Sequence, residues 1–253
     1  MRLVWPDPDP GADAGAELDR DALAALYAHP EGLLRVNFVA SADGAVAVDG
    51  LSGGLHAPGD KEVFGLLREL ADVVLVGAGT VRSEGYRGAR TSPARETRRR
   101  DRGQAPVPPI AVVTARGDLD PGAALFTDTT VPPLVLTAAD AAGSARRALA
   151  GTGTEVVPVS AGDPTVTDPD TVVRALADRG LTRVLCEGGP ALFGALLAAG
   201  RVDELCLSLA PQLVGGKAGR IVTGAALDAP RRLGLASVVA HDDGLLLRYR
   251  TGD

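Results

Sequence analysis

Short apolar runs that alternate with helical segments constrain the fold of this chain more than any other feature. Five such runs have the length of buried strands, at 73–76, 110–113, 134–136, 155–159 and 183–186. Helical segments at 139–150, 170–179 and 191–199 alternate with the later ones. Strands and helices that alternate along a chain build a mostly parallel sheet with helices on its faces. We therefore predict an α/β fold with a central sheet flanked by helices.

An earlier strand is predicted at 33–40, and residues 45–48 are expected to continue it. The turn residues Ser41-Ala42-Asp43-Gly44 interrupt it, and a strand broken at a turn often exposes its backbone to a ligand. Apolar side chains within 63–70 then share one helical face, and Asp60 suits the start of that helix. A helix is thus expected to begin near Asp60.

The C-terminal part adds antiparallel pairing. Runs at 236–240 and 245–250 flank His241-Asp242-Asp243-Gly244, which is typical of a hairpin, so we predict a mixed sheet closed by a C-terminal antiparallel hairpin. A chain of 253 residues with 45% hydrophobic content can form one core. We expect one domain at 31–253, preceded by a lead-in at 1–30 that is loose at 6–16 and holds a short helix near 18–28.

Charge and composition exclude several classes of function. The formal net charge of −6 offers no broad basic surface for nucleic acid, although a small anion needs only a local site. No apolar run near the start reaches the length of a signal peptide or membrane span, so we expect a cytoplasmic protein without membrane contact. Cys186 and Cys206 lack metal-site spacing and are expected in the core, while the arginine- and proline-rich segment 91–109 predicts a solvated, partly disordered surface loop.

The strongest local motif spans residues 187–193. A buried strand ends at Glu187, two glycines (Gly188 and Gly189) follow, and Pro190 occupies the first position of a helix. Free backbone N–H groups at such a helix start bind anions, and the glycines let a phosphate approach the main chain. The alternative is a plain tight turn between strand and helix. Glu187 needs a hydrogen-bond partner under either interpretation.

Two further turns follow buried strands. Residues 77–81 offer backbone donors and a hydroxyl but lack the third glycine and the downstream acid of a Rossmann fingerprint. Two phosphate-competent turns in one domain nevertheless indicate a dinucleotide. After the strand at 110–113, Thr114 and Arg116 offer a hydroxyl and a guanidinium suited to an adenosine 2′-phosphate, which favours NADPH over NADH. The alternative for Arg116 is an ordinary surface arginine.

Several isolated polar residues are candidates for a role in a site. Asp60 is either an acid in the first turn of its helix or a carboxyl group that faces a substrate ring. Asp43 is most simply a turn residue. His29, His56 and His241 are scattered, so neither a metal site nor a serine triad is predicted.

Five motifs follow one another in an order that carries a family resemblance. They are Phe38-Val39-Ala40-Ser41-Ala42-Asp43-Gly44, Val76-Gly77-Ala78-Gly79-Thr80-Val81, Glu187-Gly188-Gly189, Val202-Asp203-Glu204-Leu205 and Ala210-Pro211-Gln212-Leu213-Val214-Gly215-Gly216. Over about residues 33–250 the chain resembles the reductase domain of bacterial riboflavin-biosynthesis enzymes and, more closely, stand-alone proteins of the pyrimidine reductase family. Some relatives of those proteins show dihydrofolate reductase activity.

The resemblance implies a dihydrofolate-reductase-like fold, a homodimer and NADPH as cofactor. It places Ala40 and Ala47 near the nicotinamide, and Thr114 and Arg116 near the 2′-phosphate. The remaining cofactor contacts that it implies come from the two glycine turns, namely Gly77, Ala78, Gly79, Thr80, Val81, Glu187, Gly188, Gly189, Pro190, Ala191, Leu192 and Phe193.

Substrate contacts are implied for Asn37, Asp43, Asp60, Phe64, Glu84 and Arg87. Dihydrofolate reductases bind the pterin ring through an Asp that opens a helix four residues before a Phe, a spacing that Asp60 and Phe64 repeat. Reductases of bifunctional type carry a Lys in place of Asn37, and an Asp-Asp-Pro-x-Leu-Thr element where this chain has residues 83–88. That element contacts the ribose-phosphate of the substrate. The zinc deaminase signature is absent from this sequence.

The resemblance therefore implies hydride transfer from NADPH to a C=O or C=N bond of a small pyrimidine or pterin substrate. The expected activity is like that of 5-amino-6-(5-phosphoribosylamino)uracil reductase, with Asp60 or Glu187 as the catalytic acid. Reduction of dihydrofolate or a dihydropterin is the alternative. A nucleotide-binding regulator that has kept the fold without turnover is a second alternative.

Overall fold

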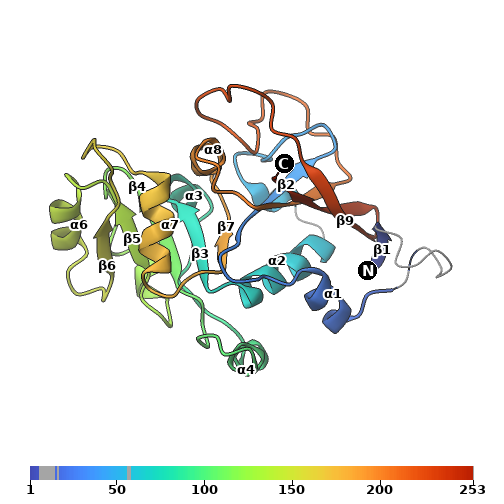
Figure 1. The fold of residues 1–253 in the computed structure, drawn as a ribbon, viewed down its shortest axis with the longest axis horizontal. Helices are drawn as coiled ribbons and strands as arrows, with labels where there is room; N and C mark the ends of the chain where they lie inside the picture. The colour runs from blue at the N-terminus through green and yellow to red at the C-terminus, as the bar shows by residue number, and fades with distance from the viewer. Residues whose placement is uncertain (6–14, 16, 56–57, 253) are drawn as a thin grey trace.

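The computed structural model describes residues 1–5, 15, 17–55 and 58–252. Its strands are β1 (Arg2–Trp5), β2 (Leu34–Ser41), β3 (Val73–Gly77), β4 (Ile110–Thr114), β5 (Leu134–Thr137), β6 (Glu155–Pro158), β7 (Val184–Cys186), β8 (Glu204–Ala210), β9 (Gly234–His241) and β10 (Gly244–Arg250). Within the described part of the chain they form one 10-stranded sheet, in the order β1-β9-β10-β8-β2-β7-β3-β4-β5-β6 (Figure 1).

The pairing of the strands confirms the predicted mixed sheet. From β8 to β6 all neighbouring strands are parallel. At the other end, β9 and β10 form the predicted antiparallel hairpin, and β10 pairs antiparallel with β8. The sequence did not predict β1, which pairs with β9 and buries only Leu3. Such a short edge strand with a single buried side chain carries no readable periodicity.

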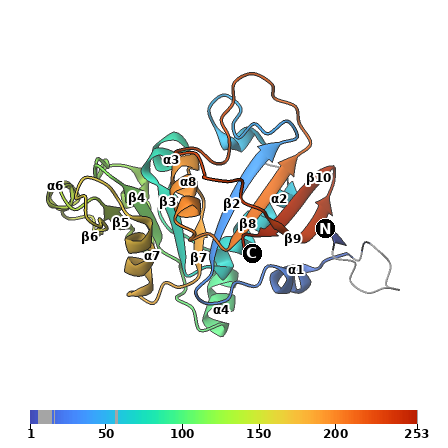
Figure 2. The ribbon, with the colours of Figure 1, turned by 45° about the horizontal axis from the view of Figure 1, so that its top comes forward.

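Helices cover both faces of the sheet (Figures 1 and 2). They are α1 (Arg20–Leu26), α2 (Pro58–Leu70), α3 (Ala78–Ser83), α4 (Pro93–Asp101), α5 (Ala124–Thr127), α6 (Ala142–Ala148), α7 (Pro169–Ala177) and α8 (Pro190–Ala198), with a 3-10 helix at Ser52–Leu55. No helix in the described ranges is long and apolar enough to cross a membrane. The predicted loose lead-in at 6–16 lies outside the described residues except for Gly15.

Alternate side chains of the strands build two cores. On one face Val74, Val76 and Cys206 pack with residues of α1, α2, α3 and α6. On the other, Leu75 and Cys186 pack with residues of α7 and α8. Both cysteines are buried, as predicted, and burial raises the pKa of each thiol to about 12. Burial on both faces explains why the parallel strands are continuous apolar runs.

The prediction that residues 45–48 continue the first strand is wrong. The backbone N–H of Ser41 bonds to the carbonyl of Ala45 at 2.9 Å, so the chain folds back on itself where Gly44 takes a positive φ of 87°. Val48 makes only an isolated bridge with Leu51. This segment forms a loop after β2, because the turn reverses the chain before a second stretch of pairing can form.

The prediction that 91–109 is a solvated, partly disordered loop is also wrong, because residues 93–101 form α4. Ser92 caps the helix by accepting from the backbone N–H of Arg95, and Pro93 occupies its first turn. The Arg99 side chain is fully buried. Its guanidinium donates to the carbonyls of Ala105, Glu69 and Ala71 at 2.7, 2.8 and 2.5 Å.

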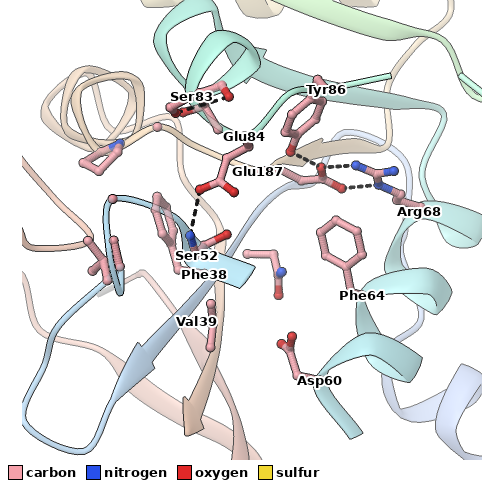
Figure 3. A pocket seen from close by; sticks show the side chains of 17 residues that line it. Phe38, Val39, Ser52, Asp60, Phe64, Arg68, Ser83, Glu84, Tyr86 and Glu187 are labelled. Carbon is pink, nitrogen blue, oxygen red and sulfur yellow. Dashed lines mark hydrogen bonds and ion pairs between the residues drawn. The ribbon is translucent and has the colours of Figure 1, made fainter. Parts of the chain in front are cut away.

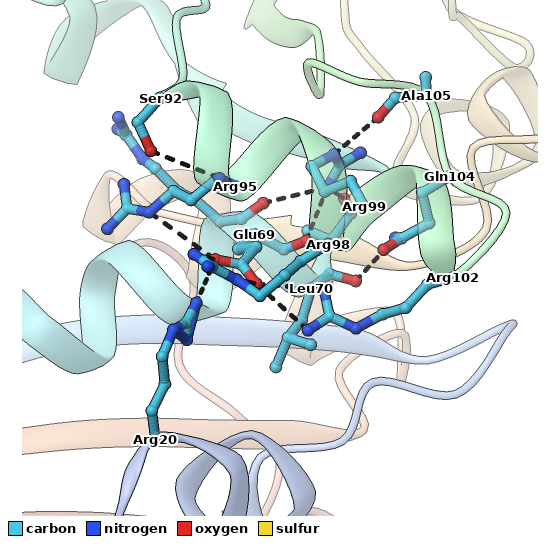
Figure 4. A network of polar contacts seen from close by, with 12 residues as sticks. Arg20, Glu69, Leu70, Ser92, Arg95, Arg98, Arg99, Arg102, Gln104 and Ala105 are labelled. Carbon is cyan, nitrogen blue, oxygen red and sulfur yellow. Dashed lines mark hydrogen bonds and ion pairs between the residues drawn. The ribbon is translucent and has the colours of Figure 1, made fainter.

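Three other arginines of this segment, Arg95, Arg98 and Arg102, gather around one buried acid of α2 (Figure 4), while Arg100 pairs with Glu96. The Glu69 side chain is fully buried and accepts from Arg98 at 2.9 Å, from Arg102 at 3.2 Å and from Arg20 of α1. Burial alone would raise the pKa of Glu69, but hydrogen bonds from Arg98 and Arg20 outweigh it and lower the pKa to about 2. Glu69 thus ties α1 and α4 to the end of α2.

Candidate active site

An open pocket of about 340 Å³ lies between β2, the inner face of α2 and the first turns of α3 and α8 (Figure 3). Side chains of β2 form its floor, and the loop after β2 forms one wall. The lining residues are Asn37, Phe38, Val39, Val46, Ala47, Gly50, Ser52, Asp60, Phe64, Arg68, Thr80, Ser83, Glu84, Tyr86, Glu187, Gly189 and Pro190. Nine of them belong to the predicted site: Asn37, Ala47, Asp60, Phe64, Thr80, Glu84, Glu187, Gly189 and Pro190.

Helix α2 contributes three side chains in a stripe. Asp60, Phe64 and Arg68 follow one another at intervals of four residues, which places them on one face of the helix. Asp60 lies in the first turn, is 4% exposed, and accepts a hydrogen bond from the hydroxyl of Ser208 at 2.5 Å. The guanidinium of Arg68 lies over the Phe64 ring, 4.5 Å from its centroid. The acid, the aromatic ring and the base therefore face the same pocket.

Glu187 has the partners that its burial requires. Its carboxylate accepts from Nε and Nη2 of Arg68, each at 2.6 Å, and from the Tyr86 hydroxyl at 2.6 Å (Figure 3). Burial and the Glu187 charge raise the pKa of Tyr86 well above its ordinary value, so this hydroxyl stays protonated and donates. Burial opposes the charge of Arg68, but attraction to Glu187 outweighs it and raises the pKa of Arg68. Both oxygens of Glu187 thus act as acceptors.

The two glycine turns lie in contact above the pocket. They follow β3 and β7, which are neighbours in the sheet. The Gly77 N–H donates to the Gly188 carbonyl at 2.7 Å, and the peptide bond between Gly188 and Gly189 is cis. A Cβ at Gly189 would lie 2.5 Å from the Thr80 hydroxyl oxygen, and one at Gly188 would lie 2.8 Å from the Phe38 ring. Larger residues would therefore fill the space between the turns.

The start of α8 fits a phosphate group. Gly189 caps the helix and Pro190 occupies its first position, as predicted. The first intrahelical bond runs from the Phe193 N–H to the Gly189 carbonyl at 3.0 Å. The N–H groups of Ala191 and Leu192 precede that bond and point out of the helix end, where an anion is stabilised. The glycines at 188 and 189 and the start of α8 together suit one phosphate group of a dinucleotide.

The third predicted turn lies at the same edge of the sheet. Gly77 of β3 is paired with Val113 of β4, so residues 114–116 lie beside the first glycine turn. The Thr114 hydroxyl accepts from the Gly117 N–H at 3.2 Å, and therefore stabilises its own turn. The Arg116 side chain is 76% exposed and pairs with Asp118 at 3.0 Å. Arg116 is thus an accessible cation at this edge, and so is Arg82, which lies 3.6 Å from the same acid and is 50% exposed.

Thirteen predicted site residues do not line the pocket. Ten of these belong to the two glycine turns and to the turn at 114–116, and the other three are Ala40, Asp43 and Arg87. Ala40 and Asp43 border a separate hollow with the glycine-rich loop at 215–219. Asp43 accepts from the Val214 and Gly215 N–H groups at 3.2 and 2.7 Å, and a hydrogen bond from Ser41 together with these lowers its pKa to about 2. Arg87 is 76% exposed and pairs with Asp128 at 3.2 Å.

Sequence reasoning did not single out Arg68 and Tyr86. Arg68 continues the four-residue spacing of Asp60 and Phe64, so an extension of that pattern could have found it. Tyr86 lies in a loop after α3 and carries no periodic signal. Its role depends on Glu187, which is 101 residues away in the sequence.

Known proteins resemble the chain over most of its length. The family described as the RibD C-terminal domain matches residues 33–247. The riboflavin biosynthesis protein RibD of Mycobacterium tuberculosis is 31% identical over 180 residues, which cover 71% of this chain and 42% of that protein. The chain therefore spans less than half the length of this curated relative.

Solved structures share the fold. A pyrimidine reductase-like protein from Corynebacterium diphtheriae superposes with a TM-score of 0.76 at 24% identity, over 88% of this chain and 92% of that one. RibD of Acinetobacter baumannii gives a TM-score of 0.68 at 20% identity, over 88% of this chain and 58% of that one. These likenesses agree with the observed sheet and its flanking helices.

Proposed function

Since this chain belongs to the family of the RibD C-terminal domain, we propose that it is an NADPH-dependent reductase of a small nitrogen heterocycle of the pyrimidine type. The observation that carries the proposal is the contact between the two glycine turns, directly above a pocket that holds a buried acid. The Gly77 N–H meets the Gly188 carbonyl at one end of this arrangement, and Asp60 lies at the other. A cofactor bound at the turns would extend toward a ring held near Asp60.

Residues of the glycine turns would hold the cofactor. The start of α8 at 188–193 and the turn at 77–81 suit its phosphates, and the exposed Arg116 suits a 2′-phosphate. Thr80 lies next to Gly189, and Ala47 lines the same pocket, where the nicotinamide would lie. When bound, NADPH supplies the hydride. The protein contributes binding, orientation and the exclusion of water.

Asp60 is the group best placed to handle a proton. It is 4% exposed, faces the pocket, and accepts from the Ser208 hydroxyl, which fixes its orientation. Glu187 accepts from Arg68 and Tyr86, so it is better suited to accept hydrogen bonds than to release a proton. We therefore assign proton delivery to Asp60, and ring positioning to Glu187 and Asn37.

A dihydropterin is the second candidate substrate. Asp60 opens α2 four residues before Phe64, and both side chains reach the pocket. A carboxyl group next to an aromatic ring can hydrogen-bond an amino-substituted pyrimidine edge and pack against its face. A pterin carries the same edge as an aminopyrimidinone, so this observation supports both substrates.

The test is NADPH oxidation, followed at the nicotinamide absorbance, with 5-amino-6-(5-phosphoribosylamino)uracil and dihydrofolate offered in parallel. At saturating substrate, Asp60→Asn is expected to lower turnover by about 10²- to 10⁴-fold, the usual contribution of a positioned acid. Asp101→Asn makes the same chemical change at an exposed position and serves as the control. Turnover by Asp60→Asn that matches the control across pH would contradict the assignment. NADPH that binds without being consumed would favour a regulator.

A further inference from the structure

The charges on the pocket walls restrict the substrate further. Asp60, Glu84 and Glu187 are acidic lining residues, and Arg68 is the single basic one among the described residues that line the pocket. We propose that the pocket binds an amino-substituted nitrogen heterocycle that carries no phosphate group. The inference rests on the proposed reductase function and names the class of its substrate.

The charge of Arg68 is balanced by Glu187. Its Nε and Nη2 each donate to Glu187 at 2.6 Å, in a bidentate pair that involves both carboxylate oxygens. Its guanidinium plane lies over the Phe64 ring at 4.5 Å and near the Tyr86 ring at 5.7 Å. These contacts fix the guanidinium against α2. A phosphate that drew the guanidinium away would leave Glu187, whose side chain is 2% exposed, without its cation.

The acids surround the pocket instead of clustering at one point (Figure 3). Asp60 lies at one end, next to Ser208 of β8. Glu84 lies on the opposite wall, where one of its oxygens accepts from the Ser52 N–H at 2.9 Å. Glu187 follows the end of β7 and lies next to Tyr86 and Arg68 (Figure 3). A phosphate monoester carries about 1.5 to 2 negative charges near neutral pH, so it would be repelled by Asp60 and Glu84, while Arg68 balances the charge of Glu187.

The two arginines that follow Tyr86 lie outside the pocket. Arg87 follows Tyr86 but pairs with Asp128 at 3.2 Å, is 76% exposed, and does not line the pocket. Arg90 pairs with the same acid and is 60% exposed. The cofactor phosphates are expected at the glycine turns, where backbone N–H groups receive them, and so they do not depend on these side chains.

An amino-substituted heterocycle matches the acceptors and rings that line the pocket. Ring N–H and exocyclic amino groups are donors, and carboxylate oxygens are acceptors of the strongest hydrogen bonds that such donors make. Asp60 and Glu84 offer these acceptors at opposite ends of the pocket, and Asn37 adds an amide. Phe38 and Phe64 offer apolar ring faces for packing. A neutral or protonated ring therefore gains contacts where a phosphate would lose them.

The test compares 5-amino-6-(ribosylamino)uracil with its 5′-phosphate by calorimetric titration of the full chain saturated with NADP⁺. We expect the unphosphorylated compound to bind about tenfold more tightly or better at low salt. The ratio is expected to shrink as salt rises from about 0.01 to about 0.15 M, because the screening length falls from about 30 to about 8 Å. Inorganic phosphate is expected not to displace the unphosphorylated compound.

A matched pair of variants locates the repulsion. Glu84→Gln removes one charge and keeps an oxygen for the Ser52 N–H, so we expect it to reduce the discrimination against the 5′-phosphate several-fold. Glu62→Gln makes the same change at an exposed position of α2 and is expected to leave the ratio unchanged. Equal or tighter binding of the 5′-phosphate would overturn the proposal, and so would a ratio that Glu84→Gln does not change.

NADPH oxidation measured with the same two compounds separates this inference from the proposed function. A higher kcat/KM for the 5′-phosphate would overturn the inference and leave the reductase function standing. Tight binding of the unphosphorylated compound without NADPH consumption would contradict the reductase function and support the inference. Failure of both compounds to bind would overturn the inference whatever the cofactor does.

Discussion

Replacing Arg68 by Met tests whether the ion pair with Glu187 holds the pocket together. The change keeps most of the apolar stem that packs against Phe64 and removes the charge. It leaves Glu187, whose side chain is 2% exposed, with the Tyr86 hydroxyl as its remaining donor of the three found. Removing one partner of a buried pair costs about 3–5 kcal/mol. The Arg68 side chain is 35% exposed, so water screens the pair, and we expect a loss of about 2–3 kcal/mol.

The assay is urea unfolding followed by circular dichroism, applied to both single variants and the double variant. Glu187→Gln alone should also destabilise the protein, because it leaves the Arg68 guanidinium without its anion. The double variant should be less destabilised than the sum of the two, with a coupling energy of about 1–3 kcal/mol. Arg201→Met breaks an exposed pair with Asp170 and is expected to cost no more than about 1 kcal/mol. Additive single effects, or an Arg68→Met loss no larger than that of this control, would refute the reasoning.

Three further predictions follow from the same structure. His29 is 6% exposed, and burial lowers its pKa to about 4, so folding favours the neutral ring. The contribution of His29 to the free energy of unfolding should therefore be complete above about pH 6.5, and about 3 kcal/mol of it should be lost as the pH falls toward 4. Urea titrations at several pH values should show this loss, and His29→Gln should reduce it; an unchanged pH dependence would count against the buried neutral ring. Gly189→Ala should weaken NADPH binding by about tenfold or more in fluorescence titrations, because its Cβ would meet the Thr80 hydroxyl 2.5 Å away, and unchanged affinity would exclude cofactor binding at this turn. Light scattering should show a homodimer, because Leu235 and Leu245 are 44% and 39% exposed on the antiparallel part of the sheet, and a monomer at micromolar concentration would contradict this.

The elements that could be predicted from the sequence are those whose signal is local. Apolar runs bounded by turns located the parallel strands, since a strand buried on both faces needs apolar residues throughout. The glycine turns were found in the same way, because Gly188 and Pro190 are residue types that their positions require. The sequence does not reveal which strands are neighbours in the sheet. In the structure β3 and β7 are neighbours, and this brings the two glycine turns into contact.

The arginine-rich segment shows where composition misleads. Charged residues are most often solvated, so a run of arginines favoured a loop. Arg99 is buried because the carbonyls at the end of α2 need donors, and its guanidinium supplies several at once. Arg98 and Arg102 then meet Glu69, which lies about 30 residues earlier. A local window contains the arginines of α4 but not the acid and carbonyls that order them.

The pocket shows the same limit in its chemistry. The spacing of Asp60 and Phe64 is local and predicted their common face, but the charge available to a ligand is set by a pair that spans 119 residues, Arg68 and Glu187. Taken singly, Arg68 would favour a phosphate and Glu187 would be a candidate acid. Paired, the two cancel, and under the proposed function Asp60 and Glu84 then determine which ligands the pocket accepts. The charge that this pocket offers a ligand therefore depends on whether its arginine is already paired with a buried acid, and motif matching along the chain does not detect that pairing.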